Sequence, residues 1–217
     1  MKVLIIDYKL SNLHSVQAAC DAVGLDAEIT SDPKKLHKAG AIILPGVGSF
    51  GKAMNNIREL ELDKPIKDFV DSGKPFFGVC LGLQLLFESS EEFGINSGLS
   101  ILEGKVKKFK DLSKESEKFP IPQIGWNKIY SQNQDWKDSY LQKCCNSTYM
   151  YFVHSFYVEP KDDSIILSKT SYGGQDYCSS VQKDNIFATQ FHPEKSGEEG
   201  LSIYRTFKIF LRNSNDK

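Results

Sequence analysis

Short continuous runs of apolar residues alternate with amphipathic stretches through the first half of the chain. The runs Val3–Ile6, Ala41–Leu44 and Phe76–Val79 are rich in β-branched or aromatic residues, which is typical of strands buried on both faces of a parallel sheet. Between them, residues 13–23 and 57–70 place apolar side chains at helical spacing. This alternation of strand and helix predicts a doubly wound α/β sheet.

The second half of the chain has a different pattern. Strands are expected over 149–158, 165–170 and 186–191, and an amphipathic helix over about 200–211. The Lys-rich stretch 103–117 favours a solvent-facing strand and loop. We therefore expect an α/β fold with a doubly wound, mostly parallel central sheet flanked by helices, and an additional antiparallel strand region in the second half. Because the sequence shows no repeat or linker, we expect residues 1–217 to form a single domain.

Composition narrows the possible functions. The 27 Lys+Arg and 28 Asp+Glu residues give a net charge of -1, so a basic footprint for nucleic acid or a membrane surface is not expected. No apolar run approaches the roughly 18 residues of a membrane span, and Asp7 ends the first run too early for a signal peptide. The five cysteines include no C-x-x-C pair, which favours free thiols in a reducing cytoplasm over a zinc site. No metal or cofactor is expected.

One cysteine stands in a pattern with chemical meaning. Cys80 is the centre of Gly78-Val79-Cys80-Leu81-Gly82, between a buried strand and an apolar helix. This is the spacing of a nucleophile elbow, in which small flanking residues permit a tight turn. The backbone N–H after the nucleophile, here that of Leu81, then faces the developing oxyanion. The alternative is a structural cysteine buried at a strand end, which is a common position for this residue type.

A thiolate nucleophile needs a base, and His192 is the best candidate among the four histidines. It follows a predicted strand in His192-Pro193-Glu194, where the carboxylate can orient the imidazole; a turn with a capping Glu is the alternative. Gly46-Val47-Gly48 follows another buried strand and can supply backbone donors. Parallel strand ends meet at one sheet edge. Together the three segments specify a Cys-His-Glu site for acyl transfer, with attack on a carboxamide and hydrolysis of the thioester.

These segments also carry a family resemblance. The sequence resembles the class I, triad-type glutamine amidotransferases and, more narrowly, the glutaminase subunits of imidazole glycerol phosphate synthases in histidine biosynthesis. The motifs that carry the resemblance are Pro45-Gly46-Val47-Gly48, Gly78-Val79-Cys80-Leu81-Gly82-Leu83-Gln84, Gly125-Trp126-Asn127, Tyr151-Phe152-Val153-His154-Ser155 and Gln190-Phe191-His192-Pro193-Glu194-Lys195-Ser196. The resemblance spans nearly the whole chain. It implies that Cys80 attacks the side-chain amide of L-glutamine, that His192 is the base, and that Glu194 orients it.

The resemblance implies further roles around the triad. Oxyanion N–H groups are implied for Val47, Gly48 and Leu81. Contacts with bound glutamine are implied for Gly48, Gln84, His154 and Ser155. An interface with a (β/α)8-barrel synthase (cyclase) subunit, the partner in a heterodimer, is implied for Asn12, Trp126, Tyr151 and Lys195. Ammonia would pass through that barrel to a nucleotide intermediate, giving imidazole glycerol phosphate and aminoimidazole carboxamide ribotide. The partner would activate the glutaminase by reorienting the P-G-V-G peptide.

Two segments depart from the usual family pattern. Lys9 and Ser11 stand where glycine is usual, and Gln123-Ile124 where His-Met is usual. Because the triad is intact, these departures bear on the partner and the ammonia acceptor more than on glutaminase chemistry. A paralogous glutaminase that supplies ammonia to a surface-sugar amidotransferase pathway is therefore the alternative. A γ-glutamyl hydrolase or Cys peptidase would instead be active without a partner, and a binding module with a decayed site would have lost a triad residue.

Overall fold

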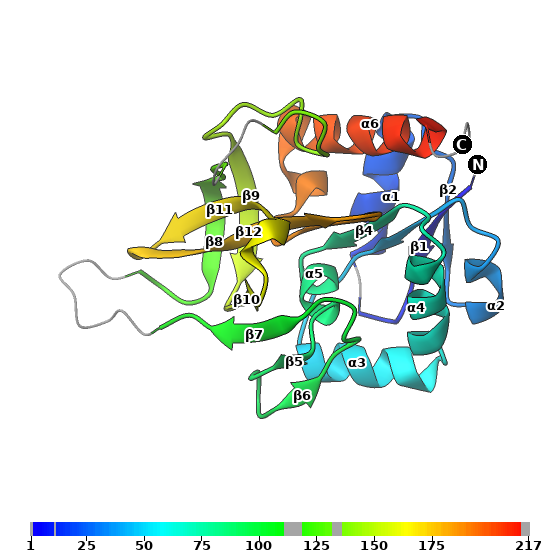
Figure 1. Ribbon diagram of the computed structural model, residues 1–217, viewed down its shortest axis with the longest axis horizontal. Helices are drawn as coiled ribbons and strands as arrows, with labels where there is room; N and C mark the ends of the chain where they lie inside the picture. Colours follow the sequence, from blue (N-terminus) through cyan, green and yellow to red (C-terminus); the bar gives the residue numbers. More distant parts are fainter. Residues whose placement is uncertain (1, 11, 111–118, 132–135, 214–217) are drawn as a thin grey trace.

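The strands predicted over 3–6, 41–44, 76–79 and 186–191 belong to one large sheet (Figure 1). The computed structural model describes residues 2–10, 12–110, 119–131 and 136–213. Its parallel part has the order β2 (Ala27–Thr30), β1 (Val3–Ile6), β3 (Ala41–Leu44), β4 (Phe76–Val79) and β13 (Ile186–Thr189). The chain passes from β1 to β2 at one edge and then returns to β3 and β4 on the other side of β1. This order confirms the predicted doubly wound, mostly parallel central sheet.

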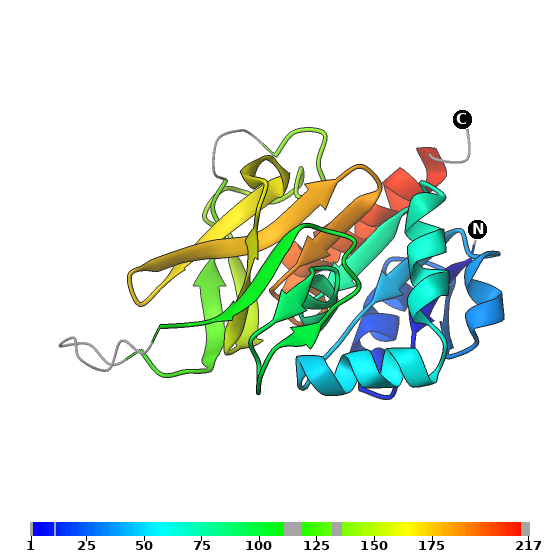
Figure 2. The same ribbon diagram turned by 60° about the horizontal axis from the view of Figure 1, so that its bottom comes forward.

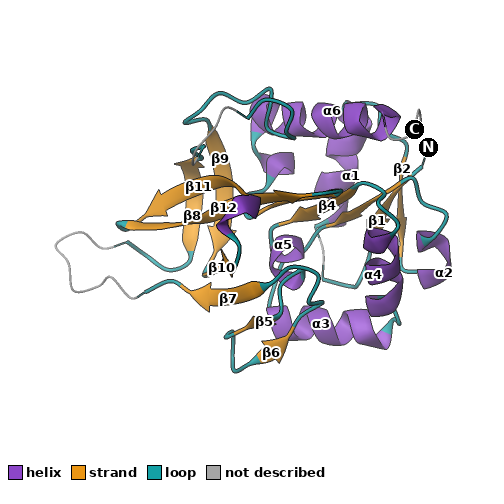
Figure 3. Ribbon diagram, viewed as in Figure 1, coloured by secondary structure: helices purple, strands orange, loops and turns teal. Residues whose placement is uncertain are grey.

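Beyond β13 the sheet becomes mostly antiparallel. The strands that follow are β12 (Gln175–Lys183), β10 (Phe156–Pro160), β7 (Gly104–Lys108), β5 (Ser89–Ser90) and β6 (Asn96–Ser97), and β11 (Ile166–Tyr172) pairs with β12. A separate antiparallel pair joins β8 (Gln123–Lys128) to β9 (Tyr149–His154). Figure 3 shows that strands dominate this end of the molecule. The expected antiparallel region of the second half is therefore present.

Helices cover both faces of the parallel strands. On one face lie α1 (Leu13–Ala22) and α6 (Gly197–Asn213), and on the other α3 (Phe50–Glu59), α4 (Asp63–Asp71) and α5 (Leu81–Leu85) (Figures 1 and 2). The short α2 (Pro33–Leu36) contacts α4, and the 3-10 helices are η1 (Asp163–Ile165) and η2 (Pro193–Lys195). No helix among the described residues is long and apolar enough to cross a membrane.

The two-sided burial of the strands explains their continuous apolar sequence. In β1, Val3 and Ile5 belong to the core under α1 and α6, whereas Leu4 and Ile6 belong to the core under α3, α4 and α5. All four side chains are buried. Since successive residues of a strand point to opposite faces, every position of such a strand must be apolar.

Two predicted elements are divided in the structure. The helix expected over 57–70 is α3 followed by α4, because Glu61 takes a left-handed conformation with φ of 54° between them. The strand expected over 149–158 is β9 and β10, which separate at Ser155 and pair with different neighbours. Apolar spacing cannot show either break, because the buried pattern continues through it. Of the stretch 103–117, β7 covers 104–108, and residues 111–117 lie outside the described residues.

Candidate active site

The turn that carries Cys80 has the geometry of a nucleophile elbow. Cys80 joins β4 to α5 with φ of 55° and ψ of -107°, a conformation that residues with a Cβ rarely adopt. Close packing requires glycine on both sides. A Cβ at Gly82 would lie 1.8 Å from the carbonyl oxygen of Leu44, and one at Gly78 would lie 2.9 Å from the Cβ of Ala188. The local sequence therefore holds a strained cysteine at the sheet edge, where it lines a cavity.

His192 and Glu194 form a buried pair just beyond the neighbouring strand β13. The Nδ1 of His192 lies 2.7 Å from Oε1 of Glu194, and both side chains are only 1% exposed. The backbone N–H of His192 donates to the carbonyl of Tyr151 at 2.9 Å, which fixes the residue against β9. Because Glu194 holds Nδ1, the other ring nitrogen, Nε2, is left for proton transfer. Within the described residues, this Nε2 makes no hydrogen bond.

The electrostatics of the site favour a charged imidazole. Burial lowers the pKa of His192, but the negative charges of the Cys80 thiolate and the Glu194 carboxylate raise it more. The net result is a pKa well above the ordinary value of histidine. A negative charge on the Cys80 sulfur and a positive charge on the His192 ring would therefore stabilise each other.

The glycine-rich loop after β3 lies over the elbow with its backbone donors already engaged. The Val47 N–H donates to the carbonyl of Leu10 at 3.1 Å, and the Leu81 N–H donates to the carbonyl of Gly46 at 3.4 Å. Gly48 has φ of 99°, a conformation open to glycine. A Cβ at Gly46 would lie 1.9 Å from the hydroxyl oxygen of Tyr8. One peptide, between Gly46 and Val47, thus engages two of the three predicted donors: its own N–H is bonded to Leu10, and its carbonyl accepts the Leu81 N–H.

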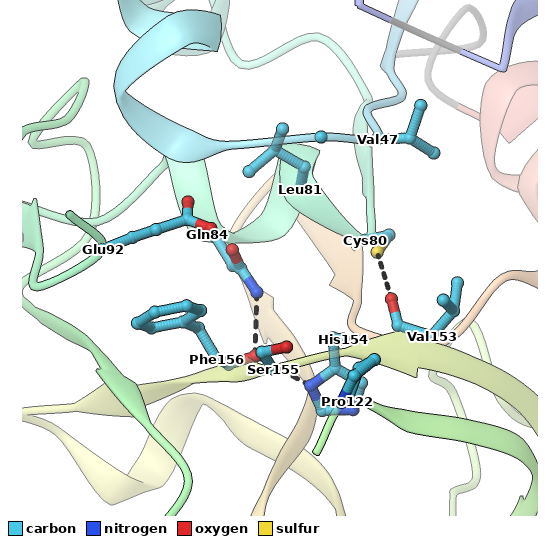
Figure 4. Close-up of a pocket in the computed structure, with 11 residues that line it drawn as sticks. Val47, Cys80, Leu81, Gln84, Glu92, Pro122, Val153, His154, Ser155 and Phe156 are labelled. Carbon is cyan, nitrogen blue, oxygen red and sulfur yellow. Dashed lines mark hydrogen bonds between the residues drawn. The ribbon is translucent and has the colours of Figure 1, made fainter.

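A cavity of about 300 Å³ opens beside the thiol (Figure 4). Its lining includes predicted site residues from the glycine-rich loop, the elbow and the end of β9, namely Val47, Gly48, Cys80, Leu81, Gln84, His154 and Ser155. His192 and Glu194 are not among the lining residues. The lining also includes Glu92, which sequence reasoning missed. Glu92 lies in the hairpin between β5 and β6, and its Oε2 accepts the backbone N–H of Phe50 at 2.5 Å. No group of three or more His, Cys, Asp or Glu side chains in the described part of the chain is arranged to hold a metal ion.

Two of the predicted glutamine contacts, Gln84 and His154, already use side-chain polar atoms in hydrogen bonds within the protein. The Nε2 of Gln84 is used inside the protein, since it donates to the carbonyl of Phe156 and to Oε1 of Gln190, each at 3.0 Å. Both ring nitrogens of His154 are also engaged, Nδ1 with the Phe156 carbonyl at 2.7 Å and Nε2 with the Tyr177 hydroxyl at 3.3 Å. Burial lowers the pKa of His154 to about 4, so its ring is neutral. A role in glutamine binding stays a prediction for these residues.

The residues predicted to meet a partner form a partly continuous surface. The rings of Trp126 and Tyr151 lie 6.1 Å apart, and the Nζ of Lys195 lies 5.9 Å from the centre of the Tyr151 ring. Trp126 is 56% exposed, and Ile124 on the same strand is 62% exposed. Asn12 is placed just before α1, which packs against η2, the helix of Lys195. The Tyr151 ring also lies 6.5 Å from that of His192, so this surface adjoins the triad.

Comparison with known families agrees with this geometry. The sequence model of the class-I glutamine amidotransferase family matches residues 4–209. The chain belongs to this class-I glutamine amidotransferase family. A relative from Rhodopirellula baltica, an imidazole glycerol phosphate synthase subunit HisH, is 47% identical over 94% of this chain and 96% of its own length. A second HisH subunit, from Aquifex aeolicus, is 43% identical over 96% of both chains. Within the class, the chain therefore falls among the HisH subunits.

Solved structures share the fold at much lower identity. The structure of PurLQS from Thermotoga maritima matches with a TM-score of 0.73 and 20% identity, covering 97% of this chain and 98% of the other. The glutaminase domain of Trypanosoma brucei CTPS with bound acivicin matches with a TM-score of 0.64 and 17% identity, covering 98% and 94%. At these identities the comparison supports the fold, and the site must be argued from the chain itself.

Proposed function

We propose that this chain is the glutaminase subunit of an imidazole glycerol phosphate synthase, hydrolysing L-glutamine to glutamate and ammonia for histidine biosynthesis. The observation that carries the proposal is the buried His192–Glu194 pair near a strained Cys80 that lines a cavity. All of the HisH relatives described above bear the name of that synthase. The alternative acceptor, in a surface-sugar pathway, is not favoured, because nothing comparable supports it.

The triad geometry supports hydrolysis in two steps. The Cys80 thiolate attacks the side-chain amide carbon of glutamine, and the His192 imidazolium protonates the leaving nitrogen, which departs as ammonia. His192, now neutral, takes a proton from water, and the resulting hydroxide attacks the thioester. Collapse of the second tetrahedral intermediate releases glutamate and restores the thiolate. Glu194 holds Nδ1 of the ring, which leaves Nε2 for the proton transfers of both steps.

Partner activation is supported by the state of the glycine-rich loop. Rotation of the Gly46–Val47 peptide would withdraw its carbonyl from the Leu81 N–H and release the Val47 N–H from Leu10. Both N–H groups would then be free to stabilise the oxyanion. A single peptide rotation could therefore switch both donors on, and glycine at Gly46 and Gly48 permits it. We propose that docking of the synthase subunit causes this rotation and that ammonia passes directly into the subunit.

Glu92 offers a carboxylate for the α-ammonium group of glutamine. We expect Glu92→Gln to raise the KM for glutamine roughly tenfold, with a smaller change in kcat, because a charge-assisted hydrogen bond is lost. The glutamine side chain keeps an oxygen for the Phe50 N–H, so the helix start is preserved. Steady-state glutaminase assays with the synthase subunit measure the effect. Glu91→Gln is the matched control, since that neighbouring carboxylate is exposed and lies outside the cavity. An unchanged KM in Glu92→Gln would refute the assignment.

The decisive test of the function is glutamine hydrolysis measured with and without a synthase subunit of (β/α)8-barrel type. We expect a large stimulation by the partner for the wild-type chain. Trp126→Ala should weaken the partner's apparent affinity about tenfold or more, as expected for an exposed aromatic anchor, and leave unstimulated hydrolysis unchanged. Ile209→Ala removes an exposed apolar side chain from α6 and should change neither quantity. Efficient hydrolysis of γ-glutamyl peptides without a partner would support a hydrolase instead.

The organisation and location of the chain follow from the same proposal. We propose that residues 1–217 form a single glutamine amidotransferase domain, since the family match extends over residues 4–209. We also propose a cytoplasmic heterodimer with the synthase subunit. A reducing compartment suits a free catalytic thiol, and all five cysteines are free thiols in the structure.

A further inference from the structure

Two buried glutamine side chains lie directly behind the nucleophile. Gln190 is fully buried and Gln84 is 6% exposed. Their side-chain amides are hydrogen-bonded to each other, and the amide of Gln190 also lies 3.7 Å from the sulfur of Cys80. Gln190 does not line the cavity, so it has no direct contact with a molecule bound there. Buried amides are normally hydrogen-bonded. The donor and acceptor of each bond in the row Phe156 carbonyl, Gln84, Gln190 and Cys80 can therefore be assigned, starting from the carbonyl.

The fixed end is a backbone carbonyl, that of Phe156. A carbonyl only accepts, so the atom of Gln84 that lies 3.0 Å from it must be the nitrogen, Nε2. The same nitrogen lies 3.0 Å from the side chain of Gln190, which must therefore present its oxygen, Oε1. This leaves the Gln190 nitrogen, Nε2, directed at the sulfur. One backbone carbonyl thus sets two amide orientations in succession, and the row ends in an N–H donor to Cys80.

The carbonyl itself is held by a second buried group. The Nδ1 of His154 also lies 2.7 Å from the Phe156 oxygen, and therefore carries the proton. The other ring nitrogen of His154 contacts the Tyr177 hydroxyl, which in turn lies 2.9 Å from Oε1 of Gln123. His154 and Tyr177 are both buried. The position of the carbonyl, and with it the direction of both amides, is therefore fixed by buried groups of the protein itself.

The two states of the sulfur meet different partners. A neutral thiol can donate its proton to the carbonyl of Val153, which lies 4.0 Å from Sγ (Figure 4). A thiolate can only accept, and Gln190 supplies an N–H for it. The ionisable groups around the sulfur are His192 with Glu194 behind it, the neutral His154, and Glu92 across the cavity. Gln190 adds an amide N–H donor, and an amide does not titrate.

We propose that Gln190 is a catalytic residue, donating a hydrogen bond to the Cys80 sulfur, and that Gln84 is the positioning residue that fixes the direction of its amide. A hydrogen bond to an anion is stronger than one to a neutral thioester sulfur. Gln190 therefore stabilises the thiolate before attack and again when the thioester breaks and the thiolate leaves. This assignment rests on the reaction proposed above and deepens it, but its main test is the reactivity of the sulfur, which can be measured without glutamine hydrolysis.

The test is the rate at which iodoacetamide alkylates Cys80, followed on the Cys80 peptide by mass spectrometry so that other thiols do not interfere. Gln190→Met keeps the length of the side chain and removes the donor. We expect alkylation at pH 7 to slow roughly tenfold, since one hydrogen bond to a charged group is lost. The pH profile of alkylation should move to higher pH by about one unit. Partner-stimulated kcat should fall, with the KM for glutamine unchanged.

Two further variants complete the test. Gln84→Met leaves Gln190 in place but frees its amide to turn, so its alkylation rate and pH profile should fall between those of the wild type and Gln190→Met. Gln182→Met is the matched control, because that glutamine accepts from the Tyr140 N–H far along β12 and should leave both unchanged. A folded Gln190→Met with wild-type alkylation overturns the proposal. If Gln190→Met does not fold, a wild-type pH profile in Gln84→Met overturns it. Absence of glutamine hydrolysis in the wild type would refute the proposed function without touching this result.

Discussion

Cys80→Ala is expected to reduce partner-stimulated glutamine hydrolysis by at least about 10⁴-fold, the scale of losing the nucleophile from a covalent triad. The reason lies in the division of roles at the site. His192 and Glu194 are hydrogen-bonded to each other, and their proposed role is proton transfer. Neither of them replaces Cys80 as the nucleophile. Alanine has no atom that can form the thioester. The N–H donors for an oxyanion remain in the variant, but no covalent tetrahedral intermediate forms for them to stabilise.

The variant should still fold and still bind the synthase subunit. Cys80 has a small side chain that lines a cavity, so its truncation disturbs little packing. The residues proposed for docking lie on β8, β9 and η2 and, in the case of Asn12, just before α1. Both properties are measured on the same preparation. A coupled assay for glutamate follows glutamine hydrolysis, and calorimetry follows partner binding. Cys145→Ala, which removes an exposed thiol, is the matched control and should match the wild type in both. Hydrolysis by Cys80→Ala at more than about one per cent of the wild-type rate would contradict the nucleophile assignment.

The triad was predictable because its constraints are local. A tight strand-to-helix turn requires small residues on both sides of Cys80, and this requirement can be recognised in the sequence as the pattern G-x-C-x-G. His192 and Glu194 are two positions apart, and their hydrogen bond needs no distant element. The buried parallel strands are equally local, since burial on both faces requires continuous apolar runs. Each of these features can be recognised without knowing which elements become neighbours.

Glu92 and the break at Ser155 depend on neighbours that the sequence does not reveal. Glu92 caps a helix that begins 42 residues earlier, and its hairpin has strands of only two residues, too short for a periodic signal. Ser155 separates two strands that both carry buried apolar side chains, and only their pairing in different sheets reveals the break. The bond from Gln190 to Cys80 spans 110 residues and arises only because β13 pairs with β4. Tertiary pairing, not propensity, creates all three features.

Gly82→Ala is expected to destabilise the protein by roughly 3 kcal/mol. The new Cβ would lie 1.8 Å from the carbonyl oxygen of Leu44 and 2.9 Å from its carbonyl carbon. These atoms belong to β3, which is hydrogen-bonded between β1 and β4 in the middle of the sheet and cannot move away cheaply. Relief must therefore come from α5, which carries Leu81 and Gln84 and begins immediately after Cys80. Loss of stability and displacement of the nucleophile are expected together.

Thermal unfolding measures the first effect, and a fall of the midpoint by roughly 5–10 °C is expected for a chain of this size. Gly51→Ala is the matched control, because it makes the same change inside another helix, α3, but its Cβ would meet the side-chain amide of Asn96 at 2.7 Å rather than backbone. The Asn96 amide donates to the carbonyls of Glu92 and Gly94, but it is the end of a side chain and can shift more easily than a backbone carbonyl inside the sheet. Alanine also favours the helix by about 1 kcal/mol, so Gly51→Ala should lose clearly less stability than Gly82→Ala. If Gly82→Ala were as stable as Gly51→Ala, α5 could withdraw from β3 without cost. The close approach of these two elements would then not be what holds Cys80 in its strained conformation.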